Sequence, residues 1–265
     1  MRQSSMVIFL AWLAPLTGLQ ALELRAASRD SEPVFIARNG QPSGVCPDIY
    51  AALERIDKDF KFRGLERRLS LPLVDRGLAT GSLDVDCSLG KSPQRDTYLR
   101  YVDEVLNTSM VVAVRADDPL VEIKDMQELV KLSKQGNPVI VRRGSVFADR
   151  LEQLGAVIDN QSTDNKANIS KLINSRGRFY YNIDYLMAAQ AKEPPGLGNI
   201  RILPTKFEPQ VTYMVVSKKL DPSVDKRIQA AMAELRKSGE LQRILAKYGV
   251  APADTNLSAT GSALR

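Results

Sequence analysis

Residues 81–95 combine the residue types that hold a carboxylate. A short apolar run, residues 83–87, leads into a loop with hydroxyl side chains, and Arg95 follows that loop. A guanidinium group presents a planar fork of donors that matches the two oxygens of a carboxylate. Backbone N–H groups exposed at the turn of Gly90 and Ser92 need acceptors as well. The segment therefore predicts a site for a carboxylate-bearing ligand.

Other kinds of chemistry have less support. The 265 residues include no histidine, which excludes histidine-based acid–base steps and Ser-His-Asp triads. Two cysteines are the only other soft ligands, which argues against a zinc site, and we expect no metal. No cofactor is expected either. The formal net charge is +6, but lysine and arginine are interleaved with acidic residues and form no stripe with aromatic residues between them. Nucleic acid is therefore not an expected partner.

The first residues have the composition of a signal peptide. Arg2 precedes the apolar run 6–16, which is shorter than the roughly 20 residues that a membrane-spanning helix needs. Small residues favour cleavage after Ala21, so we expect residues 1–21 to be removed on export. No later run is long enough to span a bilayer, and the sequence predicts a soluble exported protein.

The two cysteines are expected to form a disulfide bond. An exported chain meets oxidants, and an even pair of cysteines, Cys46 and Cys87, is typical of a structural bridge in that environment. An exposed free thiol would be a liability there. The alternative is that the two residues are separately buried thiols.

Alternating strands and helices predict an α/β fold. Expected strands span residues 22–27, 83–87, 105–115, 138–145, 178–183 and 211–217. Expected helices span residues 48–60, 71–80, 125–135, 148–154, 166–175, 185–192 and 221–248, the last with a break at Ser238 and Gly239. In such folds ligands lie at the carboxyl ends of the strands. Residues 251–265 are small and polar without periodicity, which predicts a flexible tail.

Several motifs occur in the order found in one protein family. Residues 44–48 (Gly-Val-Cys-Pro-Asp) resemble Gly-Phe-Asp-x-Asp, residues 78–84 (Leu-Ala-Thr-Gly-Ser-Leu-Asp) resemble Leu-x-x-Gly-x-x-Asp, and residues 88–95 resemble Gly-x-Thr-x-Thr-x-x-Arg. Residues 143–145, the strand near 177–178 and the ending 238–249 follow in the same order. Together, residues 22 to about 250 resemble the periplasmic solute-binding proteins of family 3, the soluble partners of ABC importers for polar amino acids.

The resemblance implies a two-lobed fold, the type II periplasmic-binding-protein clamshell, in which each lobe is a mixed sheet flanked by helices. Lobe 1 would consist of residues 22–112 and 214–250, and lobe 2 of residues 113–213, with the hinge crossings near 112–115 and 207–215. The resemblance also implies a monomer that binds a small-molecule ligand, an amino acid or an organic acid. Its partner would be an ABC transporter permease in the inner membrane.

The resemblance assigns four residues of lobe 1 to the ligand. Arg95 would pair with the ligand carboxylate, and the backbone N–H of Gly90 would add a donor. Ser88 would offer its carbonyl or hydroxyl to a ligand ammonium group, and Ser92 would brace the loop. The cysteines occupy positions that are ordinary residues in the family, and a bridge between them would stiffen this loop.

Three positions of lobe 1 leave alternatives open. From the residues alone, Arg95 could be a surface arginine paired with Asp96 or Asp103. Glu32 stands near the position where the family has an aromatic platform for the ligand. Phe35 fits the core of the lobe and the wall of the ligand cleft equally well.

From lobe 2, Ser145 and the backbone N–H of Val146 would face the ligand carboxylate at the start of a helix, where the helix dipole favours an anion. The family usually has a hydroxyl residue where Val146 stands. Asp184 would pair with the ligand ammonium group, with Asn182 and Tyr185 as alternatives. Asp184 could instead cap the helix that begins at Tyr185.

The expected function is capture of a carboxylate-bearing solute, an amino acid in the first instance, by closure of the two lobes. No catalytic residue is expected. The alternative in another class is an enzyme on the same fold, a dehydratase of the cyclohexadienyl or arogenate type, which would recruit Asp184, Glu32 or Asp30 as acid or base. A third possibility is a sensory or accessory binding protein without a dedicated permease.

Overall fold

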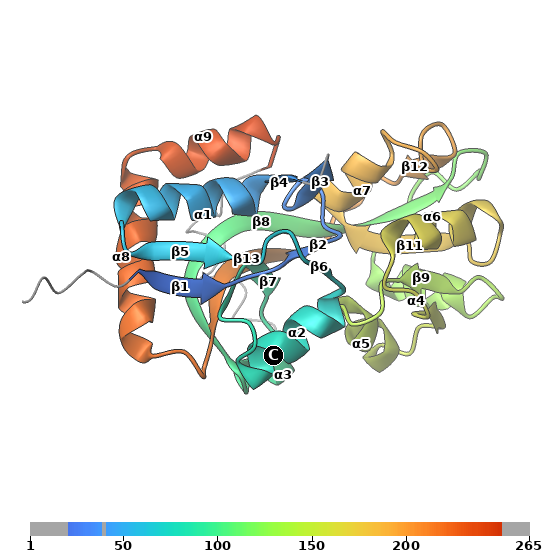
Figure 1. Cartoon of the computed structure of the whole chain (residues 1–265). Helices are drawn as coiled ribbons and strands as arrows, with labels where there is room; N and C mark the ends of the chain where they lie inside the picture. Colours follow the sequence, from blue (N-terminus) through green and yellow to red (C-terminus); the bar gives the residue numbers. More distant parts are fainter. Residues whose placement is uncertain (1–20, 39–40, 251–265) are drawn as a thin grey trace, which may run out of the picture.

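Two long antiparallel strands, β8 (Leu99–Arg115) and β13 (Phe207–Ser217), connect two lobes (Figure 1). The computed structural model describes residues 21–38 and 41–250. The expected signal peptide, apart from Ala21, and the expected tail 251–265 lie outside the described residues. Within this described part of the chain, no helix is long and apolar enough to cross a membrane.

The main sheet extends through both lobes in the strand order β10-β9-β11-β8-β13-β7. Its other members are β7 (Val85–Gly90), β9 (Val139–Val141), β10 (Ile158–Asp159), β11 (Phe179–Ile183) and β12 (Ile200–Ile202), which pairs with β8 off this path. β8 pairs with β13 over most of its length and with β11 only in its second half, where Met110 faces Ile183. One strand therefore positions residues of both lobes.

Lobe 1 contains the first and last elements of the chain. Its short strands are β1 (Leu22–Arg25), β2 (Ser28–Arg29), β3 (Ile36–Arg38), β4 (Gln41–Ser43), β5 (Phe60–Arg63) and β6 (Arg68–Leu69). Its helices are α1 (Val45–Ile56), α2 (Leu71–Thr80), α3 (Pro93–Asp96), α8 (Pro222–Lys237) and α9 (Glu240–Lys247). Parallel pairs β1–β5 and β2–β6 bring distant segments together beside β7.

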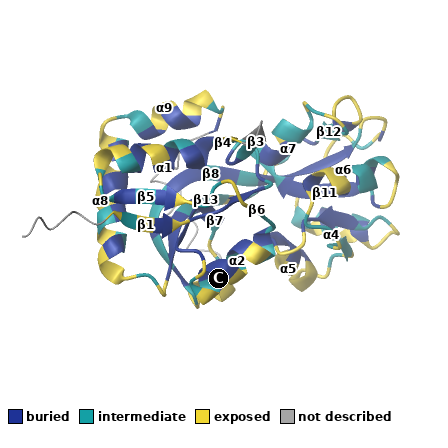
Figure 2. Cartoon of the chain, viewed as in Figure 1, coloured by how far each residue is buried: buried dark blue, intermediate teal, exposed yellow. Residues whose placement is uncertain are grey.

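Lobe 2 consists of the strands β9 to β12 and four helices. These are α4 (Met126–Ser133), α5 (Val146–Gln153), α6 (Asn165–Ile173) and α7 (Asp184–Gln190). Buried apolar residues of β9 and β11 form the centre of this lobe, between the helices (Figure 2). Apolar burial of this kind is the main favourable contribution to the stability of each lobe.

The apolar cores of the two lobes meet the connecting strands at different places. On β8, Leu106 belongs to a core cluster of lobe 1 and Met110 to one of lobe 2. On β13, Phe207 packs in lobe 2 and Met214 in lobe 1. The chain thus passes between the lobes within these two short stretches, and the boundaries at 112/113 and 213/214 stay a prediction.

Most expected elements are present, but β8 begins at Leu99 and not at Val105, and the short strands β2 to β6, β10 and β12 were not expected. The helix expected over 48–60 is α1, which ends at Ile56, and its C-cap residue Asp57 is extended with φ −111° and ψ 104°. Phe60 begins β5 instead, because alternate residues Phe60 and Phe62 are buried while the strand pairs with β1. The end of α2 at Gly81 is confirmed, and that glycine is left-handed with φ 79°.

The disulfide between Cys46 and Cys87 is confirmed. It joins α1 to β7, with 5.6 Å between the two Cα atoms, and both residues are fully buried. β7 continues from Cys87 to Gly90 and then to the loop that carries Arg95. The bridge therefore fixes the strand that leads to the predicted carboxylate loop.

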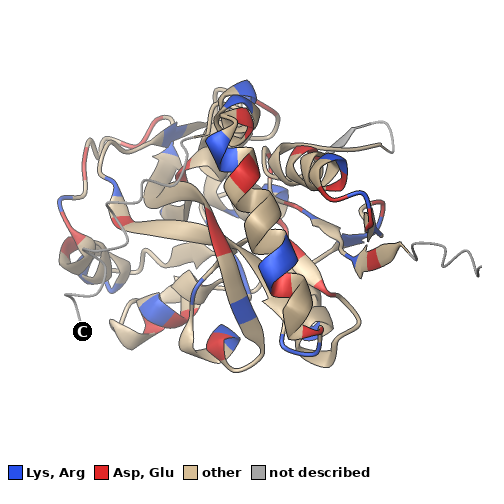
Figure 3. Ribbon diagram, turned by 90° about the vertical axis from the view of Figure 1, so that its left-hand side faces the viewer, with Lys and Arg blue, Asp and Glu red and all other residues tan. Residues whose placement is uncertain are grey.

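Charged side chains are interspersed over the outer helices. Figure 3 shows acidic and basic residues side by side at the end of lobe 1. Several of them form ion pairs between elements, such as Arg227 of α8 with Asp57 and Asp59. The net positive charge is therefore not gathered on this end of the molecule.

Candidate functional site: a cavity lined by three buried arginines

A cavity of about 50 Å³ lies between the two lobes. We call it the arginine cavity. Its polar lining consists of Arg29, Ser88, Arg95, Thr108, Arg142, Ser145, Asn182, Tyr185, Gln210 and Thr212. Its apolar lining consists of Leu71, Leu89, Val146, Phe147, Ile183 and Leu186, and Gly90 completes it. The lining therefore combines residues of lobe 1, of lobe 2 and of both connecting strands.

Arg95 reaches this cavity from α3 and is 4 % exposed. Its Nε and Nη2 atoms are each 2.9 Å from a carboxylate oxygen of Asp75 on α2, and its Nη1 donates to the carbonyl of Gly90 at 2.9 Å. The partner is therefore neither Asp96 nor Asp103. One N–H on each terminal nitrogen remains for a ligand, because each carries two.

The ion pair with Asp75 keeps Arg95 charged. Burial acts against the charged guanidinium, but the hydrogen bonds and the charge of Asp75 outweigh it, so the pKa of Arg95 lies above its usual value. Ser92 caps α3 by accepting from the backbone N–H of Arg95 at 3.3 Å, and it lies outside the cavity lining. Ser92 thus holds the short helix that carries the arginine, as a bracing residue would.

Arg29 at the end of β2 is a second buried arginine of the cavity and was not among the residues predicted from the sequence. It is 5 % exposed, and its Nε and Nη2 atoms lie 3.3 Å from the two carboxylate oxygens of Asp86. It also donates to Ser31 Oγ at 2.9 Å and to the carbonyl of Ser88. The Phe35 ring packs 5.2 Å from the guanidinium carbon and is buried behind it, so Phe35 does not line the cavity.

Arg142 is the third arginine, and it enters from lobe 2 directly after β9. It is 4 % exposed. Nη1 donates across the lobe boundary to the carbonyl of Asp30 at 2.9 Å, and Nε donates to the carbonyl of Thr163 at 3.0 Å. Nη2 is buried with no hydrogen-bond partner among the described residues. Burial, followed by the positive charge of Arg29, lowers the pKa of Arg142.

Ser145 and Val146 lie at the start of α5, where sequence analysis expected them. Ser145 is the N-cap residue and is 9 % exposed, and its hydroxyl caps no backbone N–H of the helix. Its Oγ is buried without a partner in the described structure. Both residues line the cavity, and the N-terminal end of a helix favours a negative charge.

Ser88 lines the cavity with both of its oxygens engaged. Its hydroxyl donates to Thr212 Oγ1 at 3.0 Å, and its carbonyl accepts from Arg29. These contacts join β7 to β13 and to the end of β2. Ser88 therefore orders the wall of the cavity, and its role toward a ligand ammonium group stays a prediction.

Asp184 lies outside the lining of the arginine cavity. Its Oδ1 accepts from Thr108 Oγ1 at 3.1 Å and from the backbone N–H of Tyr185 at 2.8 Å, while Oδ2 is 3.9 Å from Lys206 Nζ. Asn182 and Tyr185, the two alternatives, line the cavity instead. Asp184 is thus separated from the cavity by Thr108, the lining residue that it binds.

Tyr185 connects the lobes from α7. Its side chain packs against the core cluster of lobe 1, with its hydroxyl near Ser31 and Ser88. Burial, opposed by the charge of Arg29 and by these two serines, raises the pKa of Tyr185. The neutral hydroxyl therefore belongs to the wall between the two lobes.

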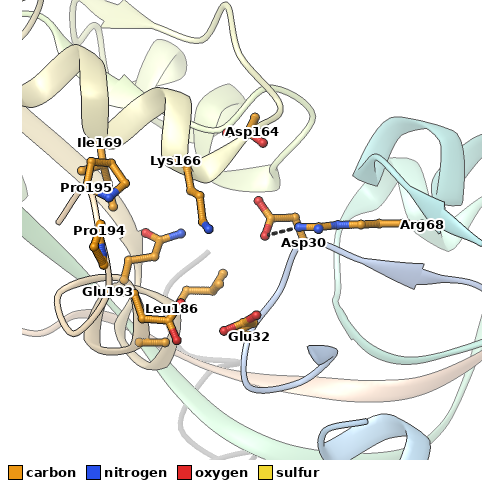
Figure 4. A pocket seen from close by; sticks show the side chains of 12 residues that line it. Asp30, Glu32, Arg68, Asp164, Lys166, Ile169, Leu186, Glu193, Pro194 and Pro195 are labelled. Atoms are coloured by element: carbon orange, nitrogen blue, oxygen red, sulfur yellow. Dashed lines mark ion pairs between the residues drawn. The ribbon is translucent and has the colours of Figure 1, made fainter. Parts of the chain in front are cut away.

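A second cavity, of about 190 Å³, is lined by residues of both lobes and shares Leu186 with the arginine cavity (Figure 4). Glu32 lines this second cavity and not the arginine cavity. Asp30 forms an ion pair of 2.8 Å with Arg68, and Lys166 of α6 reaches toward the same space from lobe 2. The two predicted carboxylates of this segment, Asp30 and Glu32, thus lie together, away from Arg95.

Asp30 also connects the two lobes. Its carbonyl accepts from Arg142 Nη1 at 2.9 Å and from Asn165 Nδ2 at 3.2 Å, and its carboxylate accepts from the backbone N–H of Asn165 at 3.2 Å. These residues stand between the second cavity and the arginine cavity. The lobes are therefore in direct polar contact around the site.

Comparison with known proteins identifies relatives of this architecture. The family model of bacterial extracellular solute-binding proteins, family 3, matches residues 24–251. No curated protein sequence matches the chain.

Three solved structures share the fold with TM-scores of 0.69 to 0.77. A mutant of the arginine-binding protein from T. maritima is 18 % identical with a TM-score of 0.71, over 85 % of this chain and 94 % of that one. A histidine kinase sensor domain with similarity to periplasmic binding proteins is 18 % identical with a TM-score of 0.77, over 88 % and 98 %. An ancestral amino-acid-binding protein, a precursor of cyclohexadienyl dehydratase, is 17 % identical with a TM-score of 0.69, over 85 % and 95 %. The expected two-lobed α/β fold is confirmed.

Proposed function

The chain belongs to the bacterial extracellular solute-binding proteins, family 3, and we propose from this premise that it captures a small carboxylate-bearing solute between its lobes. The solute would lie in the arginine cavity. Arg95 on lobe 1 would bind a carboxylate of the solute, and Ser145 with the N–H of Val146 on lobe 2 would contact the solute from the other side. Contacts of the solute with both lobes would then stabilise the closed arrangement of the lobes over the open one.

One observation carries this proposal: three arginines and the start of a helix face a single cavity between the lobes. Buried guanidinium groups and free helix N–H groups favour an anion, and organic solutes most often present one as a carboxylate. The cavity of about 50 Å³ is small beside the few hundred Å³ typical of pockets for drug-sized molecules. A solute of few atoms fits this volume.

Delivery to an ABC importer in the inner membrane is the expected consequence of capture. The signal-peptide-like start of the sequence and the disulfide support export to the periplasm, because disulfides persist in oxidising compartments. The same fold in a histidine kinase sensor domain supports a sensory role as the second candidate. Reconstitution with candidate permeases, with solute uptake as the readout, would separate the two roles.

A binding role is favoured over an enzyme. The carboxylates considered as acid or base are Asp184, Glu32 and Asp30, and none lines the arginine cavity. A general acid or base must lie within hydrogen-bond reach of the reacting group, directly or through one water molecule. One of the similar structures is a precursor of cyclohexadienyl dehydratase, so that chemistry is the second function to test.

A thermal-shift screen of amino acids and small organic acids tests the proposal. A ligand that binds only the folded protein raises the midpoint of thermal unfolding with increasing concentration. We expect at least one small carboxylate to do so, and mass spectrometry to recover it unchanged after incubation. A screen without any response, or recovery of a converted product, would contradict the proposal.

A further inference from the structure

The charges around the arginine cavity do not balance. Arg29 and Arg95 each have a carboxylate partner, Asp86 and Asp75, and both carboxylates lie behind the lining. Arg142 has none, because its hydrogen bonds go to two backbone carbonyls. Among the described residues that line the cavity there is no aspartate, glutamate or lysine. The charge of Asp30 also acts on Arg142, but Asp30 forms an ion pair of 2.8 Å with Arg68. With that pair included, four guanidinium groups face three carboxylates, and one positive charge is left uncompensated.

The uncompensated charge is that of Arg142 in lobe 2. Two donor atoms at this place have no acceptor among the described residues. Arg142 Nη2 and Ser145 Oγ are buried and unpartnered in the described part of the chain. The two residues belong to one turn, in which the backbone N–H of Ser145 donates to the carbonyl of Arg142 at 3.2 Å. A buried donor without an acceptor is unfavourable, and more so on a charged group. An anionic oxygen between them would satisfy both.

Lobe 1 offers a separate place for a negative charge. The guanidinium of Arg95 is held from behind by Asp75, with one N–H left on each terminal nitrogen. Arg29 has one N–H left on Nη1, the other being donated to Ser31. The cavity thus has donors for an anion in both lobes, from Arg95 and Arg29 in lobe 1 and from Arg142 and Ser145 in lobe 2.

No described residue that lines the cavity offers a carboxylate to an ammonium group. A buried ammonium group needs a counter-charge, and three guanidinium groups would repel it. The nearby carboxylate of Asp184 is engaged by Thr108, by the backbone N–H of Tyr185 and, at 3.9 Å, by Lys206. A zwitterionic amino acid would therefore lose the hydration of its amino group and gain only neutral acceptors, such as Gln210 and Thr212, with no counter-charge.

We infer that the arginine cavity takes a small dicarboxylate that lacks an amino group, with one carboxylate on Arg95 and the other on Arg142 and Ser145. This inference rests on the proposed function and narrows its class of solute. The apolar lining residues Leu71 and Leu89 give a short carbon chain a wall to pack on. That wall favours an organic dianion over sulfate or phosphate, which share the charge.

Titration calorimetry with three matched compounds tests the inference on the unmodified protein. L-Aspartate is succinate with an added ammonium group. L-Asparagine has the same ammonium group, but an amide replaces its second carboxylate. In a buffer free of phosphate, sulfate and carboxylates, we expect succinate to bind about tenfold or more tightly than L-aspartate. L-Asparagine should bind most weakly, and sulfate should bind more weakly than succinate.

Variants place the second carboxylate. Arg142→Gln should weaken succinate binding by about tenfold or more, because it removes the uncompensated charge. Arg143→Gln is the matched control, since Arg143 is the adjacent residue and is exposed. It should leave the affinity for succinate unchanged.

Asp184→Asn should also leave succinate binding unchanged, because the carboxylate of Asp184 lies behind Thr108. If Arg142→Gln does not fold, the ranking of the compounds by their affinity for the unmodified protein still tests the inference.

The outcomes separate this inference from the proposed function. If L-asparagine or another neutral amino acid binds as tightly as succinate, and Asp184→Asn abolishes that binding, the inference is wrong and the proposed function stands. If sulfate binds more tightly than every carboxylate, the site is one for an inorganic oxyanion and the inference is wrong. If no carboxylate or amino acid binds at all, both fail.

Discussion

Gly144 of lobe 2 lies against Pro72 of lobe 1, so close that a β-carbon on Gly144 would be 2.6 Å from the Cγ atom of Pro72. No side chain fits at that distance. Gly144 also has φ +77°, a conformation that glycine adopts without strain. The loop that carries Arg142 and Ser145 can therefore approach α2 only because residue 144 is a glycine.

Gly144→Ala should hinder closure of the lobes and weaken solute binding. Gly136→Ala is the matched control, because Gly136 has the same φ of +77° and a β-carbon there meets no atom within 4 Å. Both variants should lose about 1 kcal/mol of stability from backbone strain. Only Gly144→Ala should lower the affinity in calorimetry and enlarge the radius of gyration of the solute-bound protein in X-ray scattering. Equal affinities of the two variants would show that the contact between Gly144 and Pro72 is not needed for solute binding.

Arg95→Ala should remove the charge-assisted hydrogen bonds to the solute carboxylate. We expect a loss of about 2–4 kcal/mol of binding free energy, measured by calorimetry with the best solute of the screen. Arg76→Ala on α2 is the control, since Arg76 is exposed and should bind as the unmodified protein does. An Arg95→Ala protein that stays folded and keeps its full affinity would show that the carboxylate binds elsewhere.

Removal of the disulfide should destabilise lobe 1. The bridge joins residues 41 positions apart in the sequence, and the chain-entropy relation gives about 4 kcal/mol for a loop of that length. Denaturant unfolding of the Cys46→Ala, Cys87→Ala double variant measures this loss, and reduction of the unmodified protein should reproduce it. A double variant within about 1 kcal/mol of the unmodified protein would argue that the bridge has little effect on folding.

Asp118 should make lobe 2 sensitive to acid. The two carboxylate oxygens of Asp118 accept from Arg178 Nε and Nη2 at 2.8 and 2.9 Å, and this pairing, opposed by burial, lowers the pKa of Asp118. The unfolded chain then binds the proton more readily than the native protein. The contribution of the Asp118–Arg178 ion pair to stability is therefore complete above the pKa of Asp118 in the unfolded chain, about 4. It is lost as the pH falls through the pKa of Asp118 in the folded protein.

The variant Asp118→Asn tests this dependence. It should be about 1–3 kcal/mol less stable than the unmodified protein at pH 7, since it removes a charge from a partly buried pair. Urea unfolding between pH 2 and pH 7 should show this difference shrinking below about pH 4. A difference that stays constant down to pH 2 would mean that the ion pair does not set the acid stability.

Local patterns predicted much of the fold. The end of α2 follows from Gly81, which supplies the left-handed residue after the helix, and Ser238 with Gly239 separates α8 from α9. The expected helix over 48–60 ran too far because Phe60 continues the apolar spacing of α1. Only the pairing of β5 with β1, between distant segments, turns that residue into the start of a strand.

The candidate site was predicted in part, because burial of an arginine is not visible in the sequence. Arg142 and Arg143 are adjacent, and β9 before them is buried at every residue, so alternation cannot tell which arginine faces inward. Arg29 ends a strand of two residues, which is too short for a periodic signal. Asp75, the partner of Arg95, stands 20 positions before it on another helix, and only tertiary packing brings the two together.

A crystal structure of the protein grown with its tightest solute tests the central claim most directly. We predict the solute between the lobes, with one carboxylate within hydrogen-bond distance of Arg95 and the other end of the molecule at Arg142 and Ser145. A solute bound in the cavity lined by Glu32, or outside the space between the lobes, would contradict the account.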